Sequence, residues 1–233
     1  MLKIFKALAQ KIIYCPDSSV ILLFHHLSLI PEFDKSGCKL DTASFERMIS
    51  KYDNYVSLPE LLNGHEKNRI AVTFDDGLSD VYNIGYRYLR QRNIPFTVFV
   101  LTDFLDTEGY ITTEQLREMA NDPLVTIGAH GTSHRILKGL STEEKMAEMV
   151  NSKNILEHLT GQKVTIFAYS HGQYDGECMK ILRRVGYSFA MSVERYPYNI
   201  FTRYRRYRIP RVNVDTADIE KAEHILERIL KRC

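Results

Sequence analysis

Two adjacent carboxylates followed by a glycine, Asp75-Asp76-Gly77, stand out in this 233-residue chain as residues that could do chemistry. Carboxylates forced together repel each other, so a cation or a shared proton is expected beside them. The glycine tolerates a turn that brings both side chains toward one pocket. The alternative is a structural turn whose Asp side chains cap a helix that begins near Ser79.

Two imidazoles four residues apart form a second group, His130-Gly131-Thr132-Ser133-His134. The glycine and a preceding apolar run favour a tight loop over a helix. Two histidines with one carboxylate are a familiar ligand set for a catalytic divalent metal, and imidazole favours zinc and its neighbours over magnesium or calcium. The alternative is a pair of solvated loop histidines.

Polar residues follow predicted buried strands at four places in the chain. The four groups are His25-His26, Asp75-Asp76, His130 with His134, and Ser170-His171. In a parallel α/β fold the carboxyl ends of the strands share one face, where such folds keep their chemistry. We therefore expect the four groups to meet.

The chain alternates between predicted strands and helices. Strands are expected over residues 20–24, 70–74, 96–101, 124–129, 164–169, 187–193 and 208–212. The longer helices are expected over residues 79–92, 112–120, 141–159, 176–185 and 215–231. Such alternation predicts parallel strands joined by crossover helices, in a barrel or a large open sheet. We expect one domain over residues 1–233, with residues 1–19 as a helical N-terminal extension.

The composition is that of an ordinary globular protein, with 44% hydrophobic and 26% charged residues. A formal charge of +2 gives no strong bulk attraction to nucleic acid. A stretch rich in tyrosine and arginine, residues 196–207, is therefore interpreted as a solvated loop rather than an RNA site. The four cysteines are scattered without a C-x-x-C pair, which favours a reducing compartment.

The first residues are basic and apolar, and Lys6, Gln10 and Lys11 interrupt the apolar run. This pattern predicts an amphipathic helix rather than a signal peptide, with weak attachment to a membrane surface as an option. The apolar run over residues 20–24 is far shorter than the ~20 residues of a transmembrane helix. We expect a cytoplasmic protein or one peripheral at the inner membrane surface, and the sequence leaves its oligomeric state open.

Three motifs in this order resemble the polysaccharide deacetylases of the NodB-homology (carbohydrate esterase) type. The motifs are Thr73-Phe74-Asp75-Asp76-Gly77, His130-Gly131-Thr132-Ser133-His134 and Phe167-Ala168-Tyr169-Ser170-His171-Gly172. The resemblance implies a distorted (β/α) barrel of about seven parallel strands. It also implies a metal-dependent hydrolase that removes acetyl groups from N-acetylhexosamine units of a polysaccharide or glycan precursor.

The same resemblance implies roles for individual residues. Asp76, His130 and His134 would bind the divalent metal, with zinc favoured and cobalt, nickel or manganese as alternatives. Asp75 would be the general base that accepts a proton as water attacks the amide carbonyl. The departing amine needs a proton, and we expect His25 to supply it.

The general acid is the assignment with open alternatives. Many relatives supply a histidine near the C-terminus, where this chain has only His224 in a predicted amphipathic helix. Other relatives have a permuted arrangement with a strand that ends in Tyr-His, which Phe24-His25 resembles. His26 is the second candidate.

The third motif departs from its relatives, which commonly have Pro-Tyr where this chain has Ser170-His171. An arginine that orients the base often precedes this motif in relatives, and Arg211 is the candidate substitute here. We expect His171, Tyr169 and Arg211 on the substrate and oxyanion side of the site. These departures leave open a degenerate glycan-binding relative, or an amidase that acts on a non-sugar C–N bond.

Overall fold

The structure, a computed structural model, describes residues 18–28, 38–64, 67–194, 196–199, 202 and 204–230. The predicted helix over residues 1–17 lies outside this part of the chain. Residues 18 and 19, which we expected in the same extension, are instead buried in the fold. Ser19 forms an antiparallel bridge with Tyr198.

Within the described residues the sheet has seven strands, and all of its strand pairs are parallel. The strands are β1 (Val20–Phe24), β2 (Ile70–Phe74), β3 (Phe96–Val100), β4 (Val125–Ala129), β5 (Ile166–Ala168), β6 (Phe189–Met191) and β7 (Val212–Asn213). Their order is β6-β5-β4-β3-β2-β1-β7, a curled half-barrel. This confirms the predicted α/β barrel of about seven parallel strands, although β5, β6 and β7 are shorter than expected.

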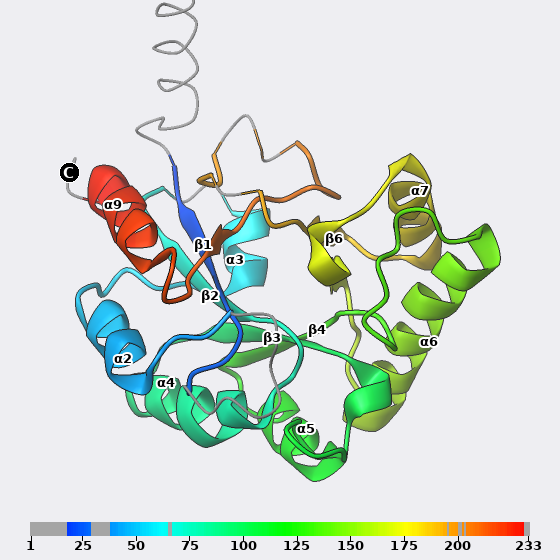
Figure 1. The fold of residues 1–233 in the computed structure, drawn as a ribbon, viewed down its shortest axis with the longest axis horizontal. Coiled ribbons are helices and arrows are strands. Elements are labelled where there is room, and N and C mark those ends of the chain that lie inside the picture. The colour runs from blue at the N-terminus through cyan, green and yellow to red at the C-terminus, as the bar shows by residue number, and fades with distance from the viewer. Residues whose placement is uncertain are drawn as a thin grey trace, which may run out of the picture.

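Most of the helices surround this sheet on its outer side, whereas the helix over residues 58–63 packs with residues inside the half-barrel (Figure 1). The helices are α2 (Thr42–Ser50), α3 (Leu58–Asn63), η1 (Val81–Tyr86), α4 (Arg87–Gln91), η2 (Thr102–Phe104), α5 (Thr113–Ala120), α6 (Thr142–Thr160), η3 (Ser170–Gly172), α7 (Gly176–Val185) and α9 (Ile219–Leu230). The predicted capping box forms at the start of α6, where Ser141 and Glu144 bond each other's backbone N–H groups. Gly161 ends that helix with φ +69°.

The predicted helix over residues 79–92 forms, but it is not α-helical throughout. The segment begins as the π-helix η1 and continues as α4. Gly85 lies in η1 with its backbone against β2, where an added Cβ would come within 3.2 Å of Phe74 Cζ. Helical periodicity predicts the face that packs on the sheet, but it does not distinguish an α-helical turn from the wider π-helical turn.

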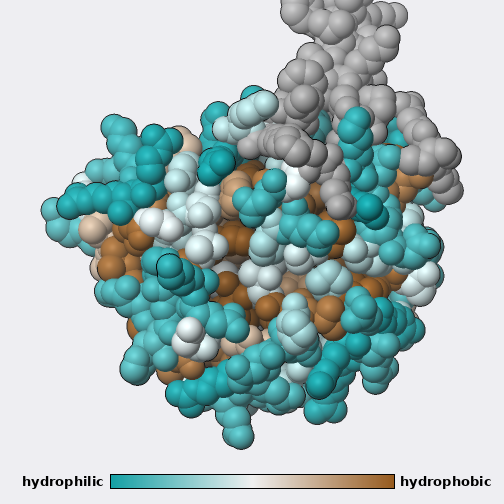
Figure 2. Space-filling model, turned by 180° about the vertical axis from the view of Figure 1, so that it is seen from behind, coloured by the Kyte–Doolittle hydropathy of each residue, from teal (hydrophilic) through white to brown (hydrophobic). Residues whose placement is uncertain are grey.

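Both faces of the sheet are buried, so these strands are buried along their whole length and consist mostly of apolar residues. Alternate residues such as Phe24, Phe74 and Phe96 pack outward against the helices, and the aromatic ring centroids of successive pairs lie 5.6 and 5.8 Å apart. Residues of the opposite parity, including Ile21 and Phe99, fill the inside of the half-barrel. From behind, Figure 2 shows apolar residues in the middle of the face and hydrophilic ones around the rim.

The tyrosine- and arginine-rich stretch is only in part the solvated loop that we expected, because residues 204–206 are exposed but other residues of the stretch are buried. Tyr204 is 80% exposed, but Tyr198 is buried. Tyr207 donates its hydroxyl to the carbonyl of Tyr187 at 3.0 Å. Tyr198 and Tyr207 thus pack against the rest of the fold, and composition alone does not distinguish such rings from an exposed one like Tyr204.

Cys38 and Cys178, the two cysteines in the described part of the chain, form no disulfide. Among the described residues, no helix combines the length and the apolar character that crossing a membrane requires.

Candidate active site

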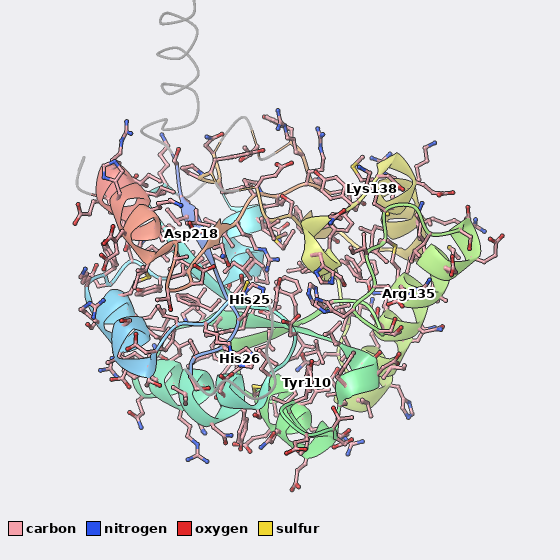
Figure 3. All side chains as sticks on the ribbon, in the orientation of Figure 1. His25, His26, Tyr110, Arg135, Lys138 and Asp218 are labelled. Atoms are coloured by element: carbon pink, nitrogen blue, oxygen red, sulfur yellow. The ribbon has the colours of Figure 1, made fainter. Side chains whose placement is uncertain are left out.

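A cavity of about 220 Å³ lies at the carboxyl ends of the strands. It collects most of the residues that the sequence singles out: His25, Asp75, Asp76, His130, His134, Tyr169 and His171. His25 follows β1, the Asp pair follows β2, His130 follows β4 and His171 follows β5. In Figure 3 the labelled His25 lies near the middle of the ring of helices. The parallel sheet thus brings the four predicted groups together.

Three side chains in this cavity converge as metal ligands do. One ligand atom from each of Asp76, His130 and His134 lies within 4.8 Å of the others. Oδ1 of Asp76 is 3.3 Å from Nε2 of His130 and 3.4 Å from Nε2 of His134. The loop between the two histidines is not helical, as its glycine predicts.

The chemistry of these three atoms fits a cation. Nδ1 of His130 lies 2.9 Å from the carbonyl oxygen of Ala168, so Nδ1 carries a hydrogen and Nε2 is the ring nitrogen that can offer a lone pair to a cation. Oδ1 of Asp76 is buried and accepts no hydrogen bond from the residues that the structure describes. Lone pairs that face each other need a positive charge between them. A histidine whose second nitrogen donates to a backbone carbonyl is also the usual arrangement at metal sites.

Asp75 stands beside this triad, bound to Arg211. Nη1 and Nη2 of the guanidinium donate to Oδ1 and Oδ2 of Asp75 at 2.6 and 2.7 Å. Arg211 is fully buried, and its Nε donates to the carbonyl of Ser192. It does not line the cavity. Its position therefore matches an orienting partner of Asp75 rather than a substrate contact.

Charged groups around the cavity lower the pKa of the two aspartates, whereas burial alone would raise it. Burial would raise the pKa of Asp75, but Arg211 and His130 hold it below its usual range. Burial would likewise raise the pKa of Asp76, and its histidine neighbours lower it. Burial lowers the pKa of His134 to about 4, so this imidazole is neutral at pH 7 with a lone pair to offer.

The two N-terminal histidines take different directions. His25 lines the cavity, and its buried Nδ1 has no hydrogen-bond partner among the described residues. His26 lies outside the cavity, with Nδ1 3.1 Å from Oδ2 of Asp80. His25 is thus the better placed of the two candidates for a general acid.

His171 and Tyr169 contribute to the wall in different ways. The ring of His171 stacks on that of His134 at 4.3 Å between centroids, and its Nε2 lies 3.2 Å from the carbonyl oxygen of His134. Tyr169 is buried, and its hydroxyl donates to the carbonyl of Tyr207 at 3.0 Å. Tyr169 therefore offers the cavity its ring, whereas its hydroxyl is engaged elsewhere.

Backbone strain gathers around this cavity. Six non-glycine residues in the described part have positive φ, and three of them are Asp76 (φ +71°), His134 (φ +61°) and His171 (φ +55°). Left-handed backbone is unfavourable for such residues and persists where surrounding structure enforces it. The surrounding structure therefore holds these three residues in a strained backbone conformation, which sets the direction of their side chains.

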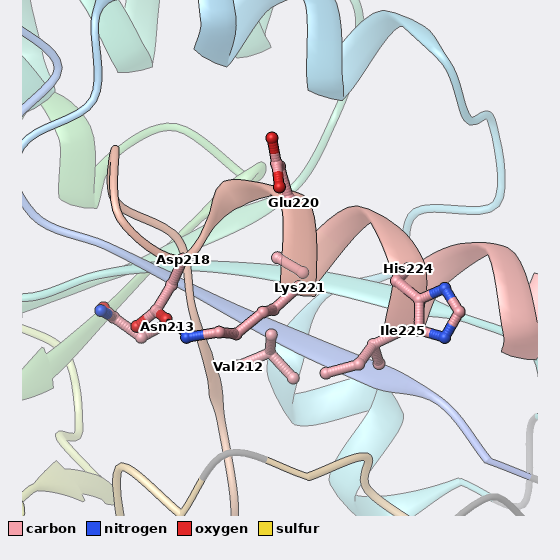
Figure 4. Close-up of a pocket in the computed structure, with 8 residues that line it drawn as sticks. Val212, Asn213, Asp218, Glu220, Lys221, His224 and Ile225 are labelled. Atoms are coloured by element: carbon pink, nitrogen blue, oxygen red, sulfur yellow. Dashed lines mark hydrogen bonds and ion pairs between the residues drawn. The ribbon is translucent and has the colours of Figure 1, made fainter.

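A larger cavity of about 460 Å³ lies elsewhere, between α9 and β7 (Figure 4). Lys221 extends across it to an ion pair with Asp218 at 2.6 Å. His224 lines this cavity and not the one that holds the metal-ligand triad. The larger cavity is therefore not the one that holds the candidate metal ligands. The position of His224 gives no support to a general acid near the C-terminus.

Sequence reasoning missed several residues around the candidate active site. Cys38, Val193 and Asn213 also line the smaller cavity. Asn213 is the one that a sequence signal could have found, because it follows the extended segment that ends at Val212.

The half-barrel thus carries at its strand ends a triad of Asp76, His130 and His134 that could hold a metal ion, with an arginine-bound aspartate beside it. The family model described as polysaccharide deacetylase matches residues 63–190, just over half of the chain. The chain belongs to the polysaccharide deacetylase family. This confirms the resemblance that the three motifs indicate.

Similar proteins agree with this assignment. The polysaccharide deacetylase homologue YxkH of Bacillus subtilis (strain 168) is 30% identical over 125 residues, which are 54% of this chain and 44% of YxkH. This match thus spans less than half of that relative. The Streptococcus pyogenes deacetylase PplD in complex with acetate has a TM-score of 0.77 at 19% identity, with 90% of this chain and 98% of that chain covered. IcaB from Ammonifex degensii has a TM-score of 0.76 at 20% identity, with 91% and 97% covered. At these identities the two structures support the fold.

Proposed function

We propose that this protein is a divalent-metal-dependent hydrolase that removes N-acetyl groups from N-acetylhexosamine units of a polysaccharide or glycan precursor. One observation carries the proposal: Asp76, His130 and His134 converge on one point while Asp75 is held beside them by Arg211. Family membership supports the substrate class, and PplD, which shares the fold, is a deacetylase.

The three converging residues would hold the ion, with zinc favoured by the imidazole ligands and cobalt, nickel or manganese as alternatives. When bound, a divalent ion supplies Lewis-acid polarisation of the amide carbonyl and a strong nucleophile at neutral pH. Oδ2 of Asp75 lies 3.8 Å from Nε2 of His130, and Asp75 is not a member of the triad. Its carboxylate would therefore not bind the ion and could act as a base.

Hydrolysis forms a C–O bond to water and breaks the amide C–N bond, giving acetate and an amine. Asp75 accepts the proton that the attacking water loses, and Arg211 keeps its carboxylate ionised and oriented. His25, across the same cavity, supplies the proton to the departing nitrogen. The rings of Tyr169 and His171 form the wall on the side of β5, where the acetyl group and sugar would lie.

Acetate release tests the proposal. Protein loaded with zinc or cobalt should release acetate from N-acetylglucosamine oligomers, and chelation should stop the release. A panel that includes non-sugar amides separates a sugar deacetylase from an amidase with other substrates. Metal-loaded protein that binds these oligomers and releases no acetate would contradict the proposal and favour a glycan-binding relative.

A further inference from the structure

A buried carboxylate that belongs neither to the triad nor to the cavity lies behind the histidine loop. Glu148 is on α6 and only 4% exposed. Its Oε2 accepts the backbone N–H groups of Thr132 at 2.7 Å and Ser133 at 3.1 Å, and its Oε1 accepts the hydroxyl of Ser133. One side chain thus binds two consecutive residues between His130 and His134.

The loop is shaped around this carboxylate. Gly131 has φ +92°, and a Cβ added there would lie 2.9 Å from Oε2 of Glu148. Two successive N–H groups that point at one anionic oxygen form a concave backbone site for negative charge. Glycine at position 131 therefore leaves the space that Glu148 occupies.

Other contacts fix the carbonyl groups of the loop and leave these N–H groups to Glu148. The hydroxyl of Ser170 donates to the carbonyl of His130 at 2.8 Å. The backbone N–H of Asp103 donates to the carbonyl of Thr132 at 3.0 Å. Removal of Glu148 would leave two loop donors without their acceptor, so the loop would move to find another.

We propose that Glu148 is a positioning residue for the metal site, a role that rests on the proposed function. Its carboxylate holds the loop in the one conformation that aims both imidazoles at Asp76. His130 extends β4 and is held by Ala168, so its ring stays in place without Glu148. His134 has left-handed backbone at the end of the loop. Without Glu148, His134 is therefore the ligand that would lose its position.

Cobalt binding tests this role without any need for turnover. Co²⁺ is titrated into the full chain, and its visible absorption reports both affinity and the ligand geometry. Glu148→Gln keeps the size of the side chain but removes its charge: its one amide oxygen can accept the Thr132 and Ser133 N–H groups only as an uncharged acceptor, and the NH2 group that then faces the Ser133 hydroxyl cannot accept from it. We expect it to weaken Co²⁺ binding about ten- to hundredfold, as loss of a residue that orients metal ligands does, and to change the spectrum.

Glu157→Gln is the matched control on the same helix. The carboxylate of Glu157 also accepts a backbone N–H, that of Val164 at 2.9 Å, and pairs with Lys153 at 2.8 Å. It holds a segment away from the histidine loop, so Co²⁺ affinity should stay at the wild-type value. Ser133→Ala is a milder second variant that should weaken Co²⁺ binding about two- to tenfold, the equivalent of one net hydrogen bond.

The possible results of these titrations separate the positioning role of Glu148 from the proposed function. Wild-type affinity and spectrum in folded Glu148→Gln would overturn the positioning role and leave the proposed function standing. Equal weakening in Glu148→Gln and Glu157→Gln would overturn it too, because the effect would then be general destabilisation. If the Gln variant does not fold, Ser133→Ala decides by the same criterion. A wild-type chain that binds no Co²⁺ would overturn the proposed function itself, and the positioning role with it.

Discussion

Arg211 binds both carboxylate oxygens of Asp75 in the interior of the half-barrel, although the two residues are 136 positions apart in the sequence. Its Nη1 and Nη2 lie 2.6 and 2.7 Å from Oδ1 and Oδ2 of Asp75. A planar guanidinium matches a carboxylate in this two-point geometry, which lysine cannot reproduce. The pair joins the segment before β7 to the end of β2. It therefore links the closure of the sheet to the orientation of the proposed base.

We expect this buried pair to behave as a unit in stability. Arg211→Met should lower the free energy of unfolding by about 3–5 kcal/mol, because Asp75 is left as an uncompensated buried charge. Adding Asp75→Asn to that variant should recover part of the loss, which urea denaturation of both single variants and the double variant would measure. Losses that simply add would show that the two residues are not coupled.

Asp75 should matter for turnover and not for metal content. Asp75→Asn should lower kcat by about 10²–10⁴-fold, the usual contribution of a general base, with the metal retained. Acetate release and metal analysis of folded protein check the two parts. Asp103→Asn is the matched control, since Asp103 is an exposed carboxylate that follows β3, and it should retain activity. Loss of metal in Asp75→Asn would place Asp75 among the ligands instead.

Metal should stabilise the fold through the triad. Zn²⁺ at a hundred times its Kd should add about 2.7 kcal/mol to the free energy of unfolding, since it binds the folded state. A rise in Tm that a chelator reverses would be the readout. His134→Ala should lose this rise, and His224→Ala, on α9 beside the other cavity, should keep it. An equal rise in both variants would place the metal elsewhere.

A buried lysine should make stability depend on acidity. Nζ of Lys145 on α6 contacts Asp175 at 2.8 Å and Glu177 at 2.6 Å beside α7. Burial opposes ionisation of Asp175, but Lys145 and backbone N–H groups hold its pKa below 3.8, and Lys145 lowers the pKa of Glu177 below 4.5. The two carboxylates therefore stabilise the fold at a pH above their ordinary pKa values. This stabilisation is lost as the pH falls through the lower pKa values that they have in the folded state.

Lys145→Met removes this contribution. The variant should have a lower urea midpoint than the wild type at pH 7, and the two midpoints should approach each other below pH ~4, the ordinary range of carboxyl groups. Urea titrations at several pH values would measure the difference. A difference that stays constant down to pH ~2 would contradict the prediction, because both carboxyl groups are then largely protonated in the unfolded state, which removes much of their stabilisation of the folded state.

The sequence by itself determined the features that depend on neighbouring residues. Apolar runs that end in polar residues located the strand ends, and parallel connectivity places those ends on one face. The motifs around Asp75 and His130 predicted the site because their spacing is local. The capping box at Ser141 and the glycine at 161 were readable for the same reason: each acts within one turn of helix.

The tertiary structure alone decided which distant residues serve these motifs. The resemblance to the family made Arg211 a candidate among the 31 lysines and arginines of the chain, and only the fold shows that it binds Asp75. Glu148 shows helical spacing like any other carboxylate on α6, and its burial against the histidine loop follows from packing. The left-handed backbone of Asp76 and His134 is likewise imposed from outside, since neither residue type prefers it. Contacts between distant segments and enforced strain depend on the packed fold, which local sequence patterns do not determine.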